Sequence, residues 1–273
     1  LGSGLFLVSL FMNSWWGMMI GWCIIMFLKL PVHLAYFGKP LRFFRTLPPF
    51  SNAWKTSWFA RGILFSVFFG TFAFIQLAVS YPAIADLLGP AAVPVYTVFA
   101  ILAGISALGV GIYGGFIMNF CKGIPFWNQG LLPVVFVLAG VADGFGLIMG
   151  IGLAGGDVNV ALAETGSLYL LLINILIIVV YLISAGYTST VARLSIKDLI
   201  SGKVAFAFWF GLIILGMIIP GAVSLAGLLT GVEVSSLMLI IAIVCHTLGA
   251  FALKYCLLRV GIYRPLLPKA AAY

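Results

Sequence analysis

Long apolar runs recur along the whole chain and constrain its fold more than any other feature. A membrane-spanning helix needs about 20 predominantly apolar residues, and polar or Pro/Gly-containing turns separate runs of this kind. Eight runs follow one another, roughly at residues 1–12, 14–37, 58–81, 93–118, 128–153, 165–187, 204–229 and 235–262. We therefore predict an all-α, polytopic integral membrane protein with eight transmembrane helices, of which helices 1 to 4 and 5 to 8 could form two four-helix bundles.

The first run is too short to cross a bilayer, and it reads as the second half of a helix. We therefore expect residues 1–273 to form a single transmembrane domain whose first helix is truncated at the N-terminus. Composition agrees with a membrane location, because 64% of the residues are hydrophobic and 7% are charged. Soluble domains have about a quarter of their residues charged.

The net charge of +8 does not indicate a nucleic-acid partner. That function needs basic residues on a solvated domain, and no polar stretch here exceeds about twenty residues. The four cysteines lie in or beside apolar runs without the spacing of a zinc or iron–sulfur site. We expect them to be small buried hydrophobic residues.

Charged residues sort to opposite ends of the predicted helices. All 14 Lys and Arg fall on or nearest one face, whereas the other face carries Asp86, Asp157, Glu164 and Glu233. A missed helix would scramble this pattern, so it supports the count of eight. Because Lys- and Arg-rich loops are normally cytoplasmic, we predict a protein of the inner (cytoplasmic) membrane with its basic face in the cytoplasm. The same cations could instead bind an acidic partner on the periplasmic side.

Residues 33–62 form a basic and aromatic loop between the second and third helices. Side chains of this kind lie in the headgroup region, with rings towards the acyl chains and cations towards water or a partner. The loop holds Lys39, Arg42, Arg45, Lys55 and Arg61, interleaved with Phe43, Phe44, Phe50, Trp54 and Trp58.

The two histidines argue against a haem held between helices. His33 is predicted near the basic face and His246 near the middle of the last helix, which separates them in depth by roughly 15 to 20 Å. The sequence also has no paired carboxylates, P-loop or Ser/His/Asp arrangement. We therefore expect no haem and no metal in this chain, and any redox chemistry must come from its substrate.

Asp143 and His246 are ionisable residues predicted to lie deep in the membrane. A charge there costs at least about 2.5 to 3.5 kcal/mol, so Asp143 should have a partner or be neutral. Two alternatives follow: a proton-conducting chain, or mutual satisfaction that holds the helices together. Lys29, Arg61 and Lys254 lie near the basic ends, where we expect their side chains to reach towards the interface.

Tyr113 begins the segment that closes the fourth helix on the basic face. Gly114 and Gly115 beside it would leave room for a flat ring, and the phenol can donate a hydrogen bond to a carbonyl oxygen. Taken alone, such a residue is more often an interfacial belt tyrosine than a ligand contact.

Three motifs occur in order along the chain: YFGKPLRFFR with the following TSWFARGILF, Y-x11-P-F-W-N from Tyr113 to Asn128, and LKYCLLRVGIYRPL near the end. Together they resemble the NrfD/PsrC-like membrane subunits of polysulfide, thiosulfate and related molybdopterin oxidoreductases. In polysulfide reductase a tyrosine of the second segment contacts the quinone. In dimethyl sulfoxide reductase anchors a histidine lies four residues before the Pro of the first turn, a position held here by Tyr36, with His33 one helical turn earlier.

The resemblance implies a haem-free anchor that reacts with menaquinone or ubiquinone. Its expected partners are a four-cluster ferredoxin-like iron–sulfur subunit and a molybdopterin (Mo or W) catalytic subunit. We therefore predict a subunit that passes electrons between the quinone pool and the docked iron–sulfur protein. The predicted residues are Tyr113, His33, Tyr36, Arg42 and Trp58 for the quinone, Asp143 and His246 for a proton path, and Lys39, Arg45, Lys55 and Lys122 for partner docking.

Two alternatives stay open. Eight helices with a buried Asp143 and His246 would also suit a secondary transporter or proton channel, although the sequence shows no inverted repeat. A purely structural anchor without quinone chemistry is the other alternative.

Overall fold

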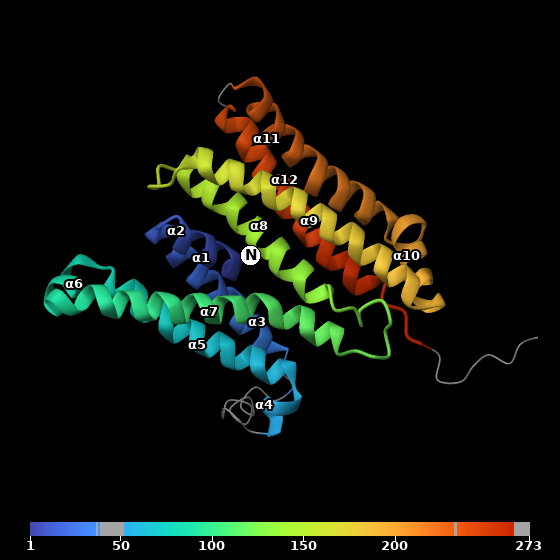
Figure 1. Ribbon diagram of the computed structural model, residues 1–273, viewed down its shortest axis with the longest axis horizontal. Helices are drawn as coiled ribbons and strands as arrows, with labels where there is room; N and C mark the ends of the chain where they lie inside the picture. The colour runs from blue at the N-terminus through green and yellow to red at the C-terminus, as the bar shows by residue number, and fades with distance from the viewer. Residues whose placement is uncertain (37, 39–51, 232–233, 265–273) are drawn as a thin grey trace, which may run out of the picture.

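The computed structural model describes residues 1–36, 38, 52–231 and 234–264, and within these residues it contains helices and no strands (Figure 1). The elements are α1 (Gly2–Phe11), α2 (Trp15–Cys23), η1 (Ile24–Lys29), α3 (Leu30–Ala35), α4 (Asn52–Thr56), α5 (Trp58–Val79), α6 (Pro82–Leu88), η3 (Gly89–Ala91), α7 (Ala92–Asn119), α8 (Leu132–Leu153), α9 (Val160–Thr188), α10 (Thr190–Ser201), η4 (Ala207–Ile218), α11 (Ile219–Thr230) and α12 (Ser236–Arg259).

The apolar helices confirm the predicted membrane fold. Seven are long and apolar enough to span a bilayer, and α1 is a shorter apolar helix, so the predicted count of eight is approximately right. The seven spans are Trp15–Ala35, Trp58–Val79, Pro82–Asn119, Leu132–Leu153, Val160–Thr188, Ala207–Thr230 and Ser236–Arg259.

The helices form two groups, as predicted. Figure 1 shows α1, α2, α5 and α7 on one side and α8 to α12 on the other. Each group has its own buried core. The first core contains Phe6, Met18, Ile25, Phe69, Ala73, Leu77, Ala103, Ala107 and Val110. The second includes Leu132, Val135, Leu171, Ile178, Tyr181, Phe208, Leu212, Leu253 and Leu257.

Helices α1 and α8 join the two groups through glycines. A methyl group added at Gly4 would overlap the backbone of Gly140, and one added at Gly144 would overlap the backbone of Gly4. Such close approach of backbones is typical of helix pairs in membranes. It places α1 of the first group against α8, the helix that carries Asp143.

Two of the spans contain π-helical turns followed by a proline. Helix η1 ends at Lys29, two residues before Pro31, and helix η4 ends at Ile218, two residues before Pro220. Proline has no N–H to donate to the preceding turn, and π-helical turns occur often at functional sites. Both interruptions lie beside the polar clusters described below.

Two predicted turns contain helices. The polar composition of residues 188–203 predicts a turn, but this segment includes the amphipathic helix α10. Its buried residues, Ala192, Ser195 and Leu199, recur at helical spacing, and Ser189 caps its first turn by accepting from the Ala192 N–H. The predicted turn between the apolar runs 58–81 and 93–118 likewise includes α6.

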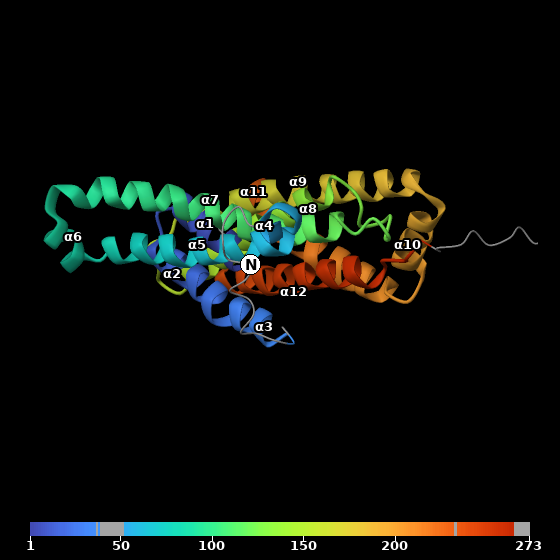
Figure 2. The ribbon, with the colours of Figure 1, turned by 90° about the horizontal axis from the view of Figure 1, so that it is seen from below.

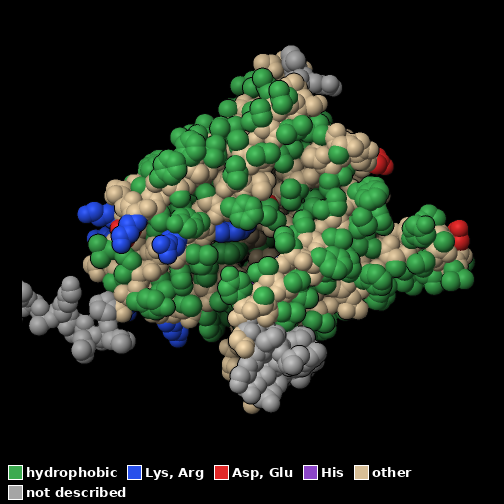
Figure 3. All heavy atoms as spheres, turned by 180° about the vertical axis from the view of Figure 1, so that it is seen from behind, with side chains coloured by type: hydrophobic (Ala, Val, Ile, Leu, Met, Phe, Trp, Pro, Cys, Tyr) green, Lys and Arg blue, Asp and Glu red, His purple; other side chains and the backbone are tan. Residues whose placement is uncertain are grey.

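The molecule is a slab, with α7 and α9 along one side and α3 and α12 along the other (Figure 2). In the space-filling view, Lys and Arg atoms gather towards one end and Asp and Glu atoms lie mostly at the other (Figure 3). The two ends therefore have the opposite charges that the sequence pattern indicates.

Candidate functional site

Tyr113 and His33 meet between α7 and α3. The Tyr113 hydroxyl lies 3.0 Å from Nε2 of His33, and Nδ1 of His33 lies 3.1 Å from the carbonyl oxygen of Lys29. The Lys29 ammonium donates to the Ser66 hydroxyl at 2.7 Å and lies 4.6 Å from the centre of the Tyr113 ring. These four residues form the tyrosine cluster.

The contact with the Lys29 carbonyl determines which ring nitrogen of His33 carries a hydrogen. A carbonyl only accepts, so Nδ1 of His33 carries the hydrogen and donates it to Lys29. In the neutral ring Nε2 is then an acceptor, and the Tyr113 hydroxyl donates to it. When His33 is protonated, Nε2 donates instead and the Tyr113 hydrogen becomes free for another acceptor. The pair can therefore pass a proton from His33 through Tyr113 to that other acceptor.

Gly62 makes room for the Tyr113 ring. A methyl group at position 62 would overlap this ring, whereas one at Gly115 would overlap the backbone of Pro133 and one at Gly114 would lie 3.5 Å from the Phe136 ring. The expectation that Gly114 and Gly115 leave room for a flat ligand ring beside Tyr113 stays a prediction, and Gly114 lines the cavity described next. The space for the Tyr113 ring itself comes from α5, more than fifty residues earlier in the chain, which no local pattern around Tyr113 reveals.

A cavity of about 350 Å³ opens beside the tyrosine cluster. Its wall includes Lys29, His33, Tyr113, Phe136, Gly140 and Lys254, together with the first three residues of the sequence, Leu1, Gly2 and Ser3. A second, much smaller space of about 20 Å³ touches the same three residues and reaches Phe59 and Ser66. Figure 3 shows a hollow near the centre of the face opposite to that of Figure 1, with Lys or Arg atoms beside it.

This larger cavity suits a flat, mostly apolar ligand. Its volume falls within the range of small-molecule sites, about 300 to 1,000 Å³, and its few polar groups converge from different helices. Apolar side chains of the first group, including Ile24, Ile25 and Val110, complete the wall.

Two of the other predicted quinone residues, Tyr36 and Trp58, lie apart from this cavity. Tyr36 is 87% exposed at the end of α3. Trp58 stacks on Phe116 with ring centres 3.9 Å apart, and the Arg61 guanidinium lies 4.5 Å from the Trp58 ring. Neither Tyr36 nor Trp58 lines the cavity. Arg42 lies outside the described residues.

The structure describes two of the four predicted docking residues. Lys55 and Lys122 are exposed at the basic end of the molecule. Lys39 and Arg45 lie outside the part of the chain that the structure describes. Arg61 donates to the carbonyl oxygens of Trp54 at 2.9 Å and Lys55 at 2.7 Å. These bonds join the first turn of α5 to the C-terminal end of α4.

Asp143 and His246 come together from α8 and α12, and Lys254 joins them. Asp143 Oδ1 lies 3.5 Å from Nε2 of His246, and Oδ2 lies 3.4 Å from the Lys254 ammonium. The Asp143 side chain is 1% exposed. The expectation that Lys254 extends to the interface is wrong, because packing of α12 on α8 turns its side chain towards Asp143.

The second contact of His246 is with the Gly216 carbonyl, one helical turn before Pro220. In a regular helix the N–H of residue 220 would donate to the carbonyl of Gly216, and proline has none. Nδ1 of His246 lies 3.3 Å from this Gly216 oxygen. Gly216 and Gly249 touch backbone to backbone, which holds η4 close enough for the contact.

The P-F-W-N segment connects helices. The Phe126 carbonyl accepts from the Tyr181 hydroxyl at 2.7 Å, and the Trp127 indole donates to the Leu257 carbonyl at 2.7 Å. Gln129, the next residue, donates to Thr188 at 2.8 Å. The segment thus ties the α7–α8 connection to α9 and to the end of α12.

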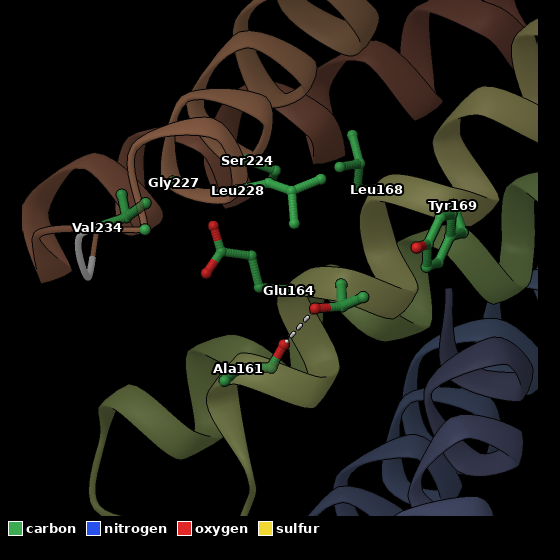
Figure 4. A pocket seen from close by; sticks show the side chains of 10 residues that line it. Ala161, Glu164, Leu168, Tyr169, Ser224, Gly227, Leu228 and Val234 are labelled. Carbon is green, nitrogen blue, oxygen red and sulfur yellow. Dashed lines mark hydrogen bonds between the residues drawn. The ribbon is translucent and has the colours of Figure 1, made fainter.

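A separate pocket of about 280 Å³ lies between α9 and α11. Figure 4 shows the Glu164 side chain directed into it, facing Ser224, Gly227 and Leu228. Its Oε1 atom is buried and has no hydrogen-bond partner among the residues that the structure describes. This pocket shares no lining residue with the cavity beside Tyr113.

Metal ligands do not cluster in residues 1–36, 38, 52–231 and 234–264, where no group of three or more His, Cys, Asp or Glu could hold an ion. The two histidines belong to different sites, His33 with Tyr113 and His246 with Asp143. The expectation of a chain without metal or haem stays a prediction.

The apolar helices define a multi-pass integral membrane protein, and a mostly apolar cavity lies between them. Residues 6–265 match the family described as polysulphide reductase, NrfD, and the chain belongs to this family. The resemblance found in the sequence motifs is thereby confirmed.

Two curated relatives support the family. The protein is similar to the C chain of polysulfide reductase from Wolinella succinogenes, with 26% identity over 59% of this chain and 52% of that protein. It is also similar to the NrfD homolog of Haemophilus influenzae, with 22% identity over 62% of this chain and 52% of that protein. The matched regions thus span about half the length of these relatives.

Proposed function

We propose that this protein is the quinone-reactive membrane subunit of an oxidoreductase complex. It would pass electrons between menaquinone or ubiquinone in the bilayer and a docked iron–sulfur subunit. The observation that carries this proposal is the hydrogen-bonded Tyr113–His33 pair in the wall of a cavity of about 350 Å³. Family membership supports it, because one relative is named as part of polysulfide reductase.

The tyrosine cluster has the groups that quinone chemistry needs. Reduction of a quinone takes up two electrons and two protons, so a ring oxygen needs a proton donor. Tyr113 would donate to that oxygen, and His33 would resupply Tyr113 through the 3.0 Å contact. The Lys29 ammonium beside the Tyr113 ring would stabilise negative charge that develops on the ligand.

The proposed partners are a four-cluster ferredoxin-like iron–sulfur subunit and a molybdopterin (Mo or W) catalytic subunit. The cations at the basic end, including Lys55 and Lys122, would meet an acidic partner surface. We place the protein in the inner (cytoplasmic) membrane with this end in the cytoplasm, on the basis of the one-sided charge.

Asp143 and His246 are proposed to conduct protons. Their contact deep between α8 and α12 also suits the alternative function, a proton channel or secondary transporter. Family membership favours the oxidoreductase subunit, because the family is described by polysulphide reductase.

Purification of the tagged protein from its native membrane tests the proposal. The expected result is a complex that contains iron–sulfur clusters, molybdenum or tungsten, and extractable quinone. Its electron transfer to or from a quinone analogue should be blocked by quinone-site inhibitors. A protein that purifies alone, without quinone, and transports protons or solutes in liposomes would contradict the proposal and support the transporter.

A further inference from the structure

Lys254 touches both polar sites of the molecule. Its side chain is 31% exposed and lines the cavity of about 350 Å³ that also contacts His33 and Tyr113. Its ammonium group lies 3.4 Å from the buried carboxylate of Asp143. Among the cavity-lining residues, Lys254 therefore connects the space where a ligand would bind with the buried Asp143–His246 pair.

The Asp143–His246 pair holds a proton that it can give up. The Gly216 carbonyl accepts a hydrogen bond from Nδ1 of His246. In the neutral ring Nε2 therefore carries no hydrogen, and it faces Asp143 Oδ1 at 3.5 Å. Neither of these facing atoms has a hydrogen-bond partner among the described residues, so the 3.5 Å contact is a close approach and not a hydrogen bond. Two lone pairs would repel there, so the contact requires one proton, on Nε2 or on the carboxyl group. The nearest group that could take up this proton is the Lys254 nitrogen, once it has released a proton of its own. It lies beside Oδ2, the second carboxylate oxygen of Asp143.

We propose that Lys254 carries protons between the cavity and the Asp143–His246 pair. The proposal rests on the proposed quinone function. On quinone reduction, two electrons come from the iron–sulfur partner, and each ring oxygen forms one O–H bond. One proton comes from Tyr113, which His33 resupplies. The other leaves the Lys254 ammonium, and the pair returns a proton to the Lys254 nitrogen. Quinol oxidation runs the same transfers in reverse.

Substitutions of Lys254 separate proton transfer from charge. Lys254→Arg keeps a cation beside Asp143, but a guanidinium stays protonated and cannot release its proton. Lys254→Met removes both charge and proton. Arg259→Gln is the matched control, because it removes a cation from the same helix at an exposed position that does not line the cavity.

The measurement is redox-induced infrared difference spectroscopy on the complete purified complex with its bound quinone. Wild type should show a protonation change of the pair with quinone reduction: a carboxylic-acid band that is absent from Asp143→Asn, or an imidazole band that is absent from His246→Gln. In Lys254→Arg and Lys254→Met the quinone bands should persist, this protonation change should disappear, and quinone turnover should fall at least tenfold. Arg259→Gln should behave like wild type.

Two results would overturn the proposal: a wild-type spectrum with neither the Asp143 nor the His246 change, or a Lys254→Arg complex with normal turnover and a normal protonation change of the pair. The latter would show that charge alone matters. If Lys254→Met does not assemble, Lys254→Gln replaces it with the same expected result. A wild-type complex without quinone bands would instead contradict the proposed quinone function.

Discussion

The Tyr113 hydroxyl and Nε2 of His33 lie 3.0 Å apart, although 80 positions separate the two residues in the chain. The contact links α7 to α3, at a point where the chain has just passed through the π-helical turn η1. It makes Tyr113 part of a relay with His33 instead of an isolated interfacial tyrosine.

Gly62→Ala should disturb the tyrosine cluster. The added methyl group overlaps the Tyr113 ring, and overpacking of this kind costs about 1 to 3 kcal/mol. We expect a lower thermal unfolding temperature and weaker quinone binding. Gly104→Ala is the matched control on α7, because its methyl group would meet the Leu10 side chain at an ordinary 3.5 Å and Gly104 does not line the cavity. Equal effects of the two substitutions would contradict the role given to Gly62.

Asp143→Asn should leave the complex assembled and slow its turnover. Asparagine keeps an acceptor for Lys254 but cannot exchange a proton with His246. Asp143→Leu should destabilise the fold by about 3 to 5 kcal/mol, because it strands the buried partners. Denaturant unfolding and steady-state assays on both variants test this. An assembled Asp143→Asn complex with normal turnover would make the cluster purely structural.

Tyr181→Phe should affect stability and not turnover. It removes the donor to the buried Phe126 carbonyl, and a stranded buried acceptor costs about 1 to 3 kcal/mol. The expected result is a lower unfolding temperature with unchanged quinone turnover per assembled complex. Loss of turnover at normal stability would assign the P-F-W-N segment to the site instead of the scaffold.

Cysteine labelling in intact cells should place the two ends of the molecule. Lys122 is exposed at the basic end and Asp157 at the acidic end. With the basic end in the cytoplasm, an impermeant thiol reagent should label Asp157→Cys and spare Lys122→Cys in a background without native cysteines. The reverse pattern would put the basic end, and the docked partner, outside the cytoplasm.

The sequence predicts most of the fold because hydropathy and charge are local signals. Apolar runs mark the spans, and the loop charges mark the two ends. Helix α10 escapes this prediction because its charged residues are also typical of a turn, although its small and apolar residues recur at helical spacing.

The site is less predictable because it depends on which helices meet. Tyr113 and His33 could be selected as residue types near the basic end, and the structure joins them. Lys254 could not, because its contact with Asp143 requires α12 to pack against α8, and hydropathy does not encode this pairing. The same holds for Gly62, whose role appears only when α5 lies beside α7.

Replacement of Tyr113 by phenylalanine is the sharpest test of the proposed quinone site. Tyr113→Phe keeps the ring packed against Gly62 and removes the hydroxyl that joins His33. A positioned proton donor contributes roughly 10²- to 10⁴-fold, so quinone turnover by the purified complex should fall by at least about 10²-fold. Activity of the catalytic subunit with an artificial electron carrier should stay near the wild-type value. If quinone turnover and inhibitor binding are both unchanged, Tyr113 does not serve the quinone and the proposed site is contradicted.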